Sequence, residues 1–203
     1  SVQVHSHSFD LSQSSNVDAM VDVCDPFDIL VNNAGAIPPG TLEEVDEETW
    51  RHGWELKVFG YINSCRQAYA RMKHRGSGVI INVIGTGGER PVAPYSAGAG
   101  GNAALMGLTR AVGGASLEDG IRVVGVNPGP IMTDRLVGGL QFRAEKRFGD
   151  GSRWRECLDE FPTLGRPPGE PEHIADMVAF LASDLSAFTT GTIITIDGGQ
   201  MGR

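Results

Sequence analysis

An apolar run that ends in two amide side chains is the segment of this chain best suited to chemistry. Residues 29–33 are mostly apolar, which is typical of a buried parallel strand, and the chain continues with Ala34 and Gly35. The side chains of Asn32 and Asn33 can both donate and accept hydrogen bonds. Because open α/β sheets bind ligands at the carboxyl ends of their strands, this segment indicates a ligand site. The alternative is a polar strand-to-loop turn in some other α/β protein.

Strand-like and helix-like segments alternate along the rest of the chain. The expected strands are residues 2–9, 29–33, 79–84, 121–126 and 192–196, and the expected helices are residues 16–23, 46–75, 97–113 and one that opens at Pro171. Asp46 is placed to cap the long second helix and Gly76 to end it. This alternation predicts an α/β fold with a doubly wound parallel sheet in a single domain.

Composition narrows the classes of function. The 203 residues are 40% hydrophobic, enough for one domain with a core. The net charge is −8 and no basic run occurs, which argues against a nucleic-acid partner. Three widely spaced cysteines, Cys24, Cys65 and Cys157, predict buried thiols in a reducing compartment, hence a cytoplasmic protein.

Neither a metal site nor a membrane segment is predicted. The chain has no Cys-x-x-Cys pair and no His/Cys cluster. His5 and His7 share one face of the first expected strand, so they are either surface histidines or a sparse metal pair. No apolar run reaches the ~18 residues of a membrane helix, and the first residues are unlike a signal peptide.

An ordered series of short motifs resembles the short-chain dehydrogenase/reductase family. The series is Asp10, Asn32–Gly35, Ile81–Val83, Tyr95, Gly120–Val123, Pro128–Gly129, Thr133, Thr190–Gly191 and Asp197–Gly199. The resemblance covers residues 1–203 and implies a Rossmann-like domain, NAD or NADP as cofactor and a small-molecule substrate. It also implies a homodimer or homotetramer formed through the helices expected at residues 46–75 and 97–113.

The opening motif of that family is missing. Its members begin with a strand, a glycine-rich turn and a helix that hold the pyrophosphate, followed by a second strand. This chain opens at the equivalent of the third strand, and Gly85–Gly88 lies too late to replace the turn. A sheet without its first two strands would expose apolar edges. We therefore expect an amino-terminally incomplete domain; the alternative is a protein that dispenses with this part.

The resemblance also implies the contacts of the cofactor. Asp10 would meet the adenine amino group and Leu11 would offer a backbone N–H. The adenosine ribose would lie beside Asn33, Ala34 and Gly35, and the nicotinamide carboxamide beside Pro128, Gly129, Ile131 and Thr133.

The catalytic positions depart from the family pattern. Tyr95 matches the tyrosine acid/base, although it could be only a partly buried tyrosine at a helix start. The lysine expected four residues later is Ala99, and the serine expected at the strand end is Gly85. Thr86 is a candidate replacement for that serine, one residue out of place.

Lys57 occupies the position of the family's helical asparagine. We hypothesise that Lys57 replaces the lysine lost at position 99; alternatively it extends to solvent and pairs with an acid such as Glu55. Asn102 is either a polar site residue or a helix-packing residue.

The sequence therefore predicts an oxidoreductase that transfers hydride between a nicotinamide cofactor and a carbonyl or alcohol, with Tyr95 as acid/base. The loss of serine and lysine at positions 85 and 99 leaves an alternative, a catalytically impaired dinucleotide-binding sensor or scaffold. Residues 134–163, with Arg143, Phe148, Trp154 and Phe161, correspond to the variable substrate lid.

Overall fold

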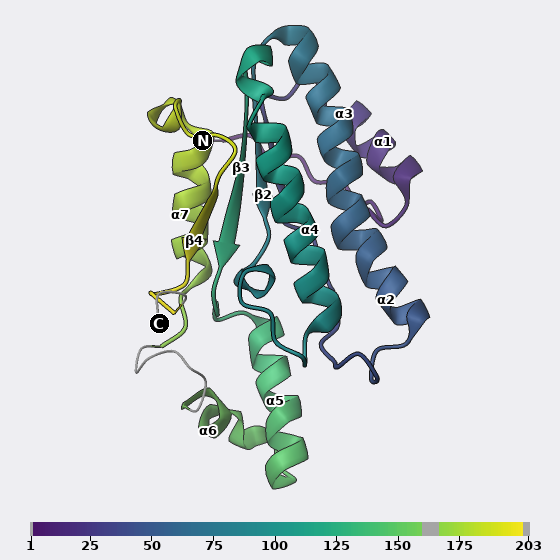
Figure 1. Cartoon of the computed structure of the whole chain (residues 1–203), viewed down its shortest axis with the longest axis vertical. Coiled ribbons are helices and arrows are strands. Elements are labelled where there is room, and N and C mark those ends of the chain that lie inside the picture. The colour runs from purple at the N-terminus through teal and green to yellow at the C-terminus, as the bar shows by residue number, and fades with distance from the viewer. Residues whose placement is uncertain (1, 160–166, 201–203) are drawn as a thin grey trace.

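The computed structural model of the chain describes residues 2–159 and 167–200 and holds a four-stranded parallel sheet (Figure 1). The strands are β1 (Ile29–Asn32), β2 (Gly78–Val83), β3 (Ile121–Pro128) and β4 (Ile193–Ile196), in the order β1-β2-β3-β4. The helices are α1 (Ser14–Cys24), α2 (Glu47–Trp54), α3 (Gly60–Arg75), α4 (Ser96–Gly113), α5 (Asp134–Phe148), α6 (Trp154–Asp159) and α7 (Pro171–Ala182). The expected doubly wound α/β fold is confirmed.

Helices cover both faces of the sheet, as the continuous apolar strands require. On one face, Ile80 and Val123 pack against α3 and α4 through residues such as Met72. On the other face, Ile81 and Val124 pack against α7. Figure 1 shows α7 on the opposite side of β2 and β3 from α3 and α4. Both cores are built from alternate residues of the same strands.

The long helix expected over residues 46–75 is interrupted by a π-helical turn. Asp46 caps α2 by accepting a hydrogen bond from the Thr49 N–H at 2.8 Å, and Gly76, in the left-handed conformation, ends α3. Between α2 and α3 lies the π-turn Glu55–Phe59, which contains Lys57. Such turns are rare and are frequent at functional sites.

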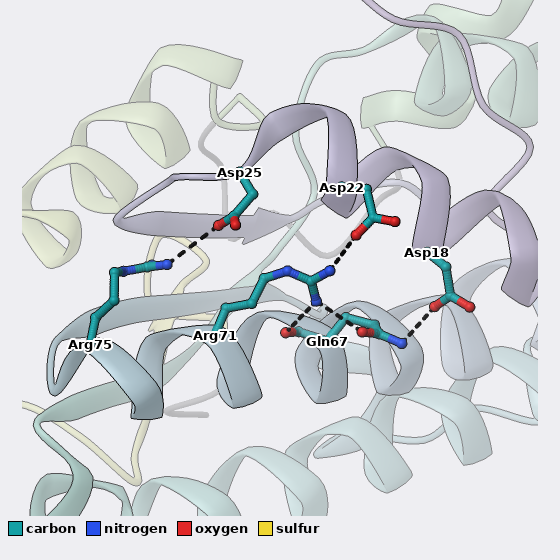
Figure 2. Close-up of polar contacts among 6 residues, drawn as sticks. All are labelled: Asp18, Asp22, Asp25, Gln67, Arg71 and Arg75. Atoms are coloured by element: carbon teal, nitrogen blue, oxygen red, sulfur yellow. Dashed lines mark hydrogen bonds and ion pairs between the residues drawn. The ribbon is translucent and has the colours of Figure 1, made fainter.

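A row of polar contacts fastens α1 to α3 (Figure 2). Asp18 accepts a hydrogen bond from Gln67 at 2.6 Å, and Asp22 pairs with Arg71 one helical turn further along. Asp25 and Arg75 close the row at 3.4 Å. Because residues four apart lie on one helix face, the row lets α1 run alongside α3 in register.

The strand predicted at residues 2–9 is wrong. The segment has no regular structure, its side chains are almost all exposed, and His5 and His7 therefore share no strand face. Alternation of apolar and polar residues sorts side chains between two faces, but a strand also needs a backbone partner. Among the described residues, β1 is hydrogen-bonded only to β2.

The predicted lid is helical. Helices α5 and α6 lie beyond the carboxyl end of β3 in Figure 1, joined by a core of Leu140, Ala144 and Cys157. Phe161 and the end of the lid fall outside the described residues. No helix in the described ranges is both long enough and apolar enough to span a bilayer.

Candidate active site

Three loops meet at the carboxyl edge of the sheet. They follow β1, β2 and β3, which are adjacent in the sheet and parallel, so all three loops leave at the same edge. Most of the predicted site residues lie on these loops: Asn33, Ala34 and Gly35 on the first, Thr86 on the second, and Pro128, Gly129, Ile131 and Thr133 on the third. Tyr95 and Lys57 come from the helices that cover them.

Lys57 is buried at this edge. Its side chain is 8% exposed, and its Nζ donates a hydrogen bond to the Ile84 carbonyl at 2.6 Å. Burial, followed by the charge of Arg135, lowers the pKa of Lys57 to about 8. The alternative in which Lys57 extends to solvent to pair with Glu55 is wrong, because the π-turn points the side chain between the sheet and α4.

The peptide at Gly85 is held by side chains from three elements. Lys57 binds the carbonyl just before it, and Asn102 on α4 donates its Nδ2 to the Gly85 carbonyl at 3.4 Å. Asn127, at the end of β3, accepts a hydrogen bond from the Gly85 N–H at 3.2 Å. Gly85 has φ of 128°, a conformation in which a side chain is strained. The geometry explains a glycine where the family pattern has a serine.

Tyr95 lies directly before α4, and its ring folds back over the first turn of that helix. A Cβ placed on Gly98 would lie 1.9 Å from Tyr95 Cζ, so only glycine leaves room for the ring. A Cβ on Gly87 would lie 3.2 Å from Tyr95 Cδ1, which puts the ring beside the loop after β2. The Tyr95 hydroxyl makes no hydrogen bond with any residue that the structure describes.

Thr86 is half-buried beside Gly85. It opens a short 3₁₀ turn, Thr86–Gly88, and its carbonyl accepts hydrogen bonds from the N–H groups of Glu89 and Arg90, both at 3.0 Å. The backbone of Thr86 is thus fixed. Its hydroxyl makes no hydrogen bond within the described ranges.

The residues of the loop after β1 differ in their exposure and packing. Asn33 and Ala34 are exposed, whereas Gly35 packs on Lys57: a Cβ there would lie 2.7 Å from Lys57 Cδ. Arg135, in the first turn of α5, donates hydrogen bonds to the carbonyls of Gly35 at 3.3 Å and Ile37 at 2.8 Å. The lid helix is thereby tied to this loop.

Asn32, the first amide of the opening motif, belongs to the interior. Its Nδ2 donates to Asn82 Oδ1 at 2.9 Å, and Asn82 donates in turn to the Thr109 hydroxyl at 3.0 Å. Cys65 joins this group, and burial raises the pKa of its thiol to about 12. The network links β1 and β2 to α3 and α4 and holds the edge where the site lies.

The loop after β3 is fixed at both ends. The Gly129 N–H donates to the Ile196 carbonyl at 2.9 Å, and a Cβ on Gly129 would lie 2.6 Å from Asp197 Cβ. Thr133 caps α5 by accepting a hydrogen bond from the Leu136 N–H at 3.4 Å. Pro128 ends β3, and Ile131 forms a β-bridge with Gly169.

Asp10 and Leu11 lie at the start of α3, on the α1 side. The Leu11 carbonyl would be 3.1 Å from a Cβ on Gly60, which explains the glycine there. Asp10 Oδ1 accepts hydrogen bonds from the Ser12 hydroxyl at 2.7 Å and the Ser12 N–H at 3.0 Å, and these bonds lower the pKa of Asp10. In the described chain Asp10 thus shapes the turn into α1.

Two residues that hold the loops of the site, Asn127 and Arg135, are not predicted from the sequence, and the role of Asn102 stays open at that level. Asn127 directly follows an apolar strand, as Asn32 does, and this pattern places it at the carboxyl edge of the sheet. Arg135 gave no signal, because an arginine in the first turn of a helix reads as surface charge. The sequence is compatible with either a site role or a packing role for Asn102, and the structure puts it against Gly85. Within the described residues no group of three or more potential metal ligands gathers.

Comparisons with known proteins show the family of the chain. A family described as enoyl-(acyl carrier protein) reductase matches residues 2–201. A 2-keto-3-deoxy-L-fuconate dehydrogenase of Xanthomonas campestris is 33% identical over 192 residues, covering 94% of this chain and 62% of that protein. A cis-4-hydroxycyclohexanecarboxylate dehydrogenase of Sinomonas cyclohexanicum is 35% identical, covering 94% of this chain and 74% of that protein.

Among solved structures, the L-sorbose reductase of Gluconobacter frateurii complexed with NADPH and L-sorbose is similar with a TM-score of 0.84 at 29% identity. The match covers 96% of this chain and 75% of that one. The chain thus spans between three fifths and three quarters of these relatives. From this match along nearly its whole length, the chain belongs to the short-chain dehydrogenase/reductase family.

Proposed function

We propose that the chain is the catalytic part of an oxidoreductase that moves a hydride between a nicotinamide cofactor and the carbonyl or alcohol carbon of a small molecule. The observation that carries this proposal is that buried Lys57 bonds the carbonyl directly before Gly85, while the Tyr95 ring lies beside Gly87 in the same loop after β2. The relatives named above as dehydrogenases and a reductase support oxidation and reduction of alcohols and ketones.

NAD or NADP is the proposed cofactor, and the residues present suit its adenosine ribose and its nicotinamide carboxamide. Asn33 and Ala34 stand exposed at the end of β1, where a ribose would meet an amide and a small side chain. Ile131 and Thr133 lie in the loop after β3, where the carboxamide would lie, and the Thr133 hydroxyl donates to the Ile131 carbonyl at 3.4 Å. When bound, the nicotinamide would accept or supply the hydride.

Tyr95 is the proposed acid/base. Its hydroxyl is not committed to another described residue, so it can give a proton to a carbonyl oxygen and take one back from an alcohol. A lysine ammonium in such a site can hold the ribose of the nicotinamide cofactor. We assign this part to Lys57, with Thr86 as a second hydroxyl beside the reacting oxygen.

Association of copies through α3 and α4 is a separate proposal. An apolar hollow of about 500 Å³ opens between these helices, lined by residues that include Ile62, Tyr69, Leu108 and Val112. A second copy of the chain would cover it in a homodimer or homotetramer. Sedimentation at micromolar concentration should show a dimer or larger species, and a monomer alone would refute this.

Spectrophotometric turnover tests the main proposal. The chain is mixed with NADH or NADPH and a panel of small ketones, keto acids and sugars, with wild type compared to Tyr95→Phe and Tyr69→Phe. Tyr69 is the control, because its hydroxyl bonds Asp119 at 2.6 Å, outside the site. We expect Tyr95→Phe to lose at least about 100-fold in kcat while Tyr69→Phe keeps it.

The sensor or scaffold alternative predicts a different result. It rests on the missing serine and lysine at positions 85 and 99. Tight binding of NADH or NADPH without turnover of any compound, in wild type as in Tyr95→Phe, would favour it and reject the catalytic proposal.

A further inference from the structure

One buried amide of the site lacks half of its hydrogen bonds. Asn102 is 3% exposed, and its Oδ1 is the one buried side-chain atom among the described residues with no hydrogen-bond partner. Buried polar atoms nearly always have a partner, and leaving an acceptor without one destabilises the fold. An acceptor left in this state suggests a partner that arrives with a ligand.

The orientation of this amide is fixed by its neighbour. Asn102 Nδ2 points at the Gly85 carbonyl, and turning the amide over would place two oxygens against each other. Asn102 therefore offers a free acceptor, Oδ1, and a second hydrogen on Nδ2.

Glycines make room next to this amide. A Cβ on Gly85 would lie 3.1 Å from Asn102 Nδ2. A Cβ on Gly87 would lie 3.5 Å from the same nitrogen and 3.2 Å from the Tyr95 ring. The amide and the ring thus border the same position, where the chain places no side chain.

We propose that Asn102 hydrogen-bonds the reacting oxygen of the substrate beside Tyr95; this rests on the proposed oxidoreductase function. A carboxamide suits both states of that oxygen, because Oδ1 accepts from an alcohol and Nδ2 donates to a carbonyl. In oxidation, a bound nicotinamide would take the hydride from the alcohol carbon, while the hydroxyl proton would pass to the deprotonated Tyr95 oxygen as the C=O bond forms. Asn102 exchanges no atom.

Thr86 is the competing candidate for the same task. Its hydroxyl is next to Gly85 and has no partner among the described groups, but it lacks the burial of Asn102. A comparison of Thr86→Ala with Asn102 variants therefore separates the two residues.

A stability measurement needs no substrate. Asn102→Leu removes the unpartnered oxygen and one long hydrogen bond to Gly85, whereas the control Asn82→Leu breaks three buried hydrogen bonds, with Asn32, Cys65 and Thr109. We expect Asn82→Leu to lower the melting temperature by more than about 5 °C and Asn102→Leu to stay within about 2 °C of wild type or above it. An Asn102→Leu variant that melts as low as the control would show a structural role and overturn the proposal.

Kinetics test the contact with the oxygen itself. Asn102→Leu should lower kcat by about 10- to 100-fold, and by more than Thr86→Ala does, with an unchanged Kd for NADPH. Asn102→Asp should reduce ketones only at low pH, since only a protonated carboxyl can donate to the carbonyl. A full loss in Thr86→Ala with active Asn102 variants would overturn the proposal. If wild type turns over nothing, the oxidoreductase proposal fails, and the melting comparison alone decides whether Asn102 is kept for stability.

Discussion

The buried lysine gives the sharpest physical prediction. The pKa of Lys57 is about 8 in the folded chain against 10.5 for a solvated lysine, because burial disfavours the ammonium and Arg135 repels it. Between these two pKa values the unfolded chain holds a proton that the folded chain has lost. The free energy of unfolding must therefore rise with pH across this window. At 1.36 kcal/mol per pKa unit, the full rise is about 3 kcal/mol.

Lys57→Met isolates this contribution. Methionine keeps the unbranched apolar length of the side chain but cannot titrate, and it leaves the Ile84 carbonyl without its donor at every pH. Urea unfolding of both proteins, from pH 7 to pH 10.5, gives the difference in their free energies of unfolding. Other groups that titrate in this range, such as Cys65, are present in both chains and cancel.

We expect the difference, wild type minus variant, to increase by about 3 kcal/mol from pH 7 to pH 10.5, with half of the rise complete near pH 9. A difference that stays constant would show that Lys57 is solvated in the folded chain. A difference that falls with pH would mean that the folded protein stabilises the ammonium, for instance by an acid that the structure does not place there. Either result would refute the account of the site given above.

Further predictions concern the contact between α1 and α3 and the packing of the Tyr95 ring on Gly98. Arg71→Ala should lower the free energy of unfolding in urea by about 0.5–1 kcal/mol, because the pair with Asp22 is partly exposed; no change, or a loss of several kcal/mol, would contradict this. Gly98→Ala should displace the Tyr95 ring and lower kcat at least as far as Tyr95→Phe does. The control Gly107→Ala on the same helix meets no atom within 4 Å and should stabilise the chain by about 0.5–1 kcal/mol. A fully active Gly98→Ala variant would show that the ring position is unimportant.

The fold followed from periodicity where strands are buried on both faces. Continuous apolar runs such as residues 79–84 can only be central strands, and the stripe of the long helix fixed its inward face. The strand predicted at residues 2–9 is wrong because the alternation of apolar and polar residues is a property of one segment, whereas strand pairing requires two segments. The π-turn at residues 55–59 is also not visible in the pattern, because Trp54, Val58 and Ile62 keep the spacing of four that an uninterrupted α-helix also allows.

The candidate site was predictable as a set of positions but not as a set of contacts. Spacing pointed to Tyr95 and Lys57, and the structure brings both to the same sheet edge. The direction of each side chain depended on tertiary structure: Asn102 turns to Gly85 and Asn127 meets it from the opposite strand. Such contacts join residues that are up to 42 apart in the chain, which no local pattern reports.

The glycine of the opening motif shows why a motif carries more than one meaning. In the Asn-Asn-Ala-Gly segment, the family resemblance implies that Gly35 lies beside the cofactor. In this chain, a Cβ on Gly35 would also lie 2.7 Å from Lys57 Cδ. Lys57 lies in the π-turn and bonds the Ile84 carbonyl, which directly precedes Gly85, whose φ of 128° would strain any other residue. With Lys57 in this position, a residue larger than glycine at position 35 would displace the lysine side chain. The departures from the family pattern at positions 57 and 85 are thus physically coupled, and restoring either family residue singly should disturb the other.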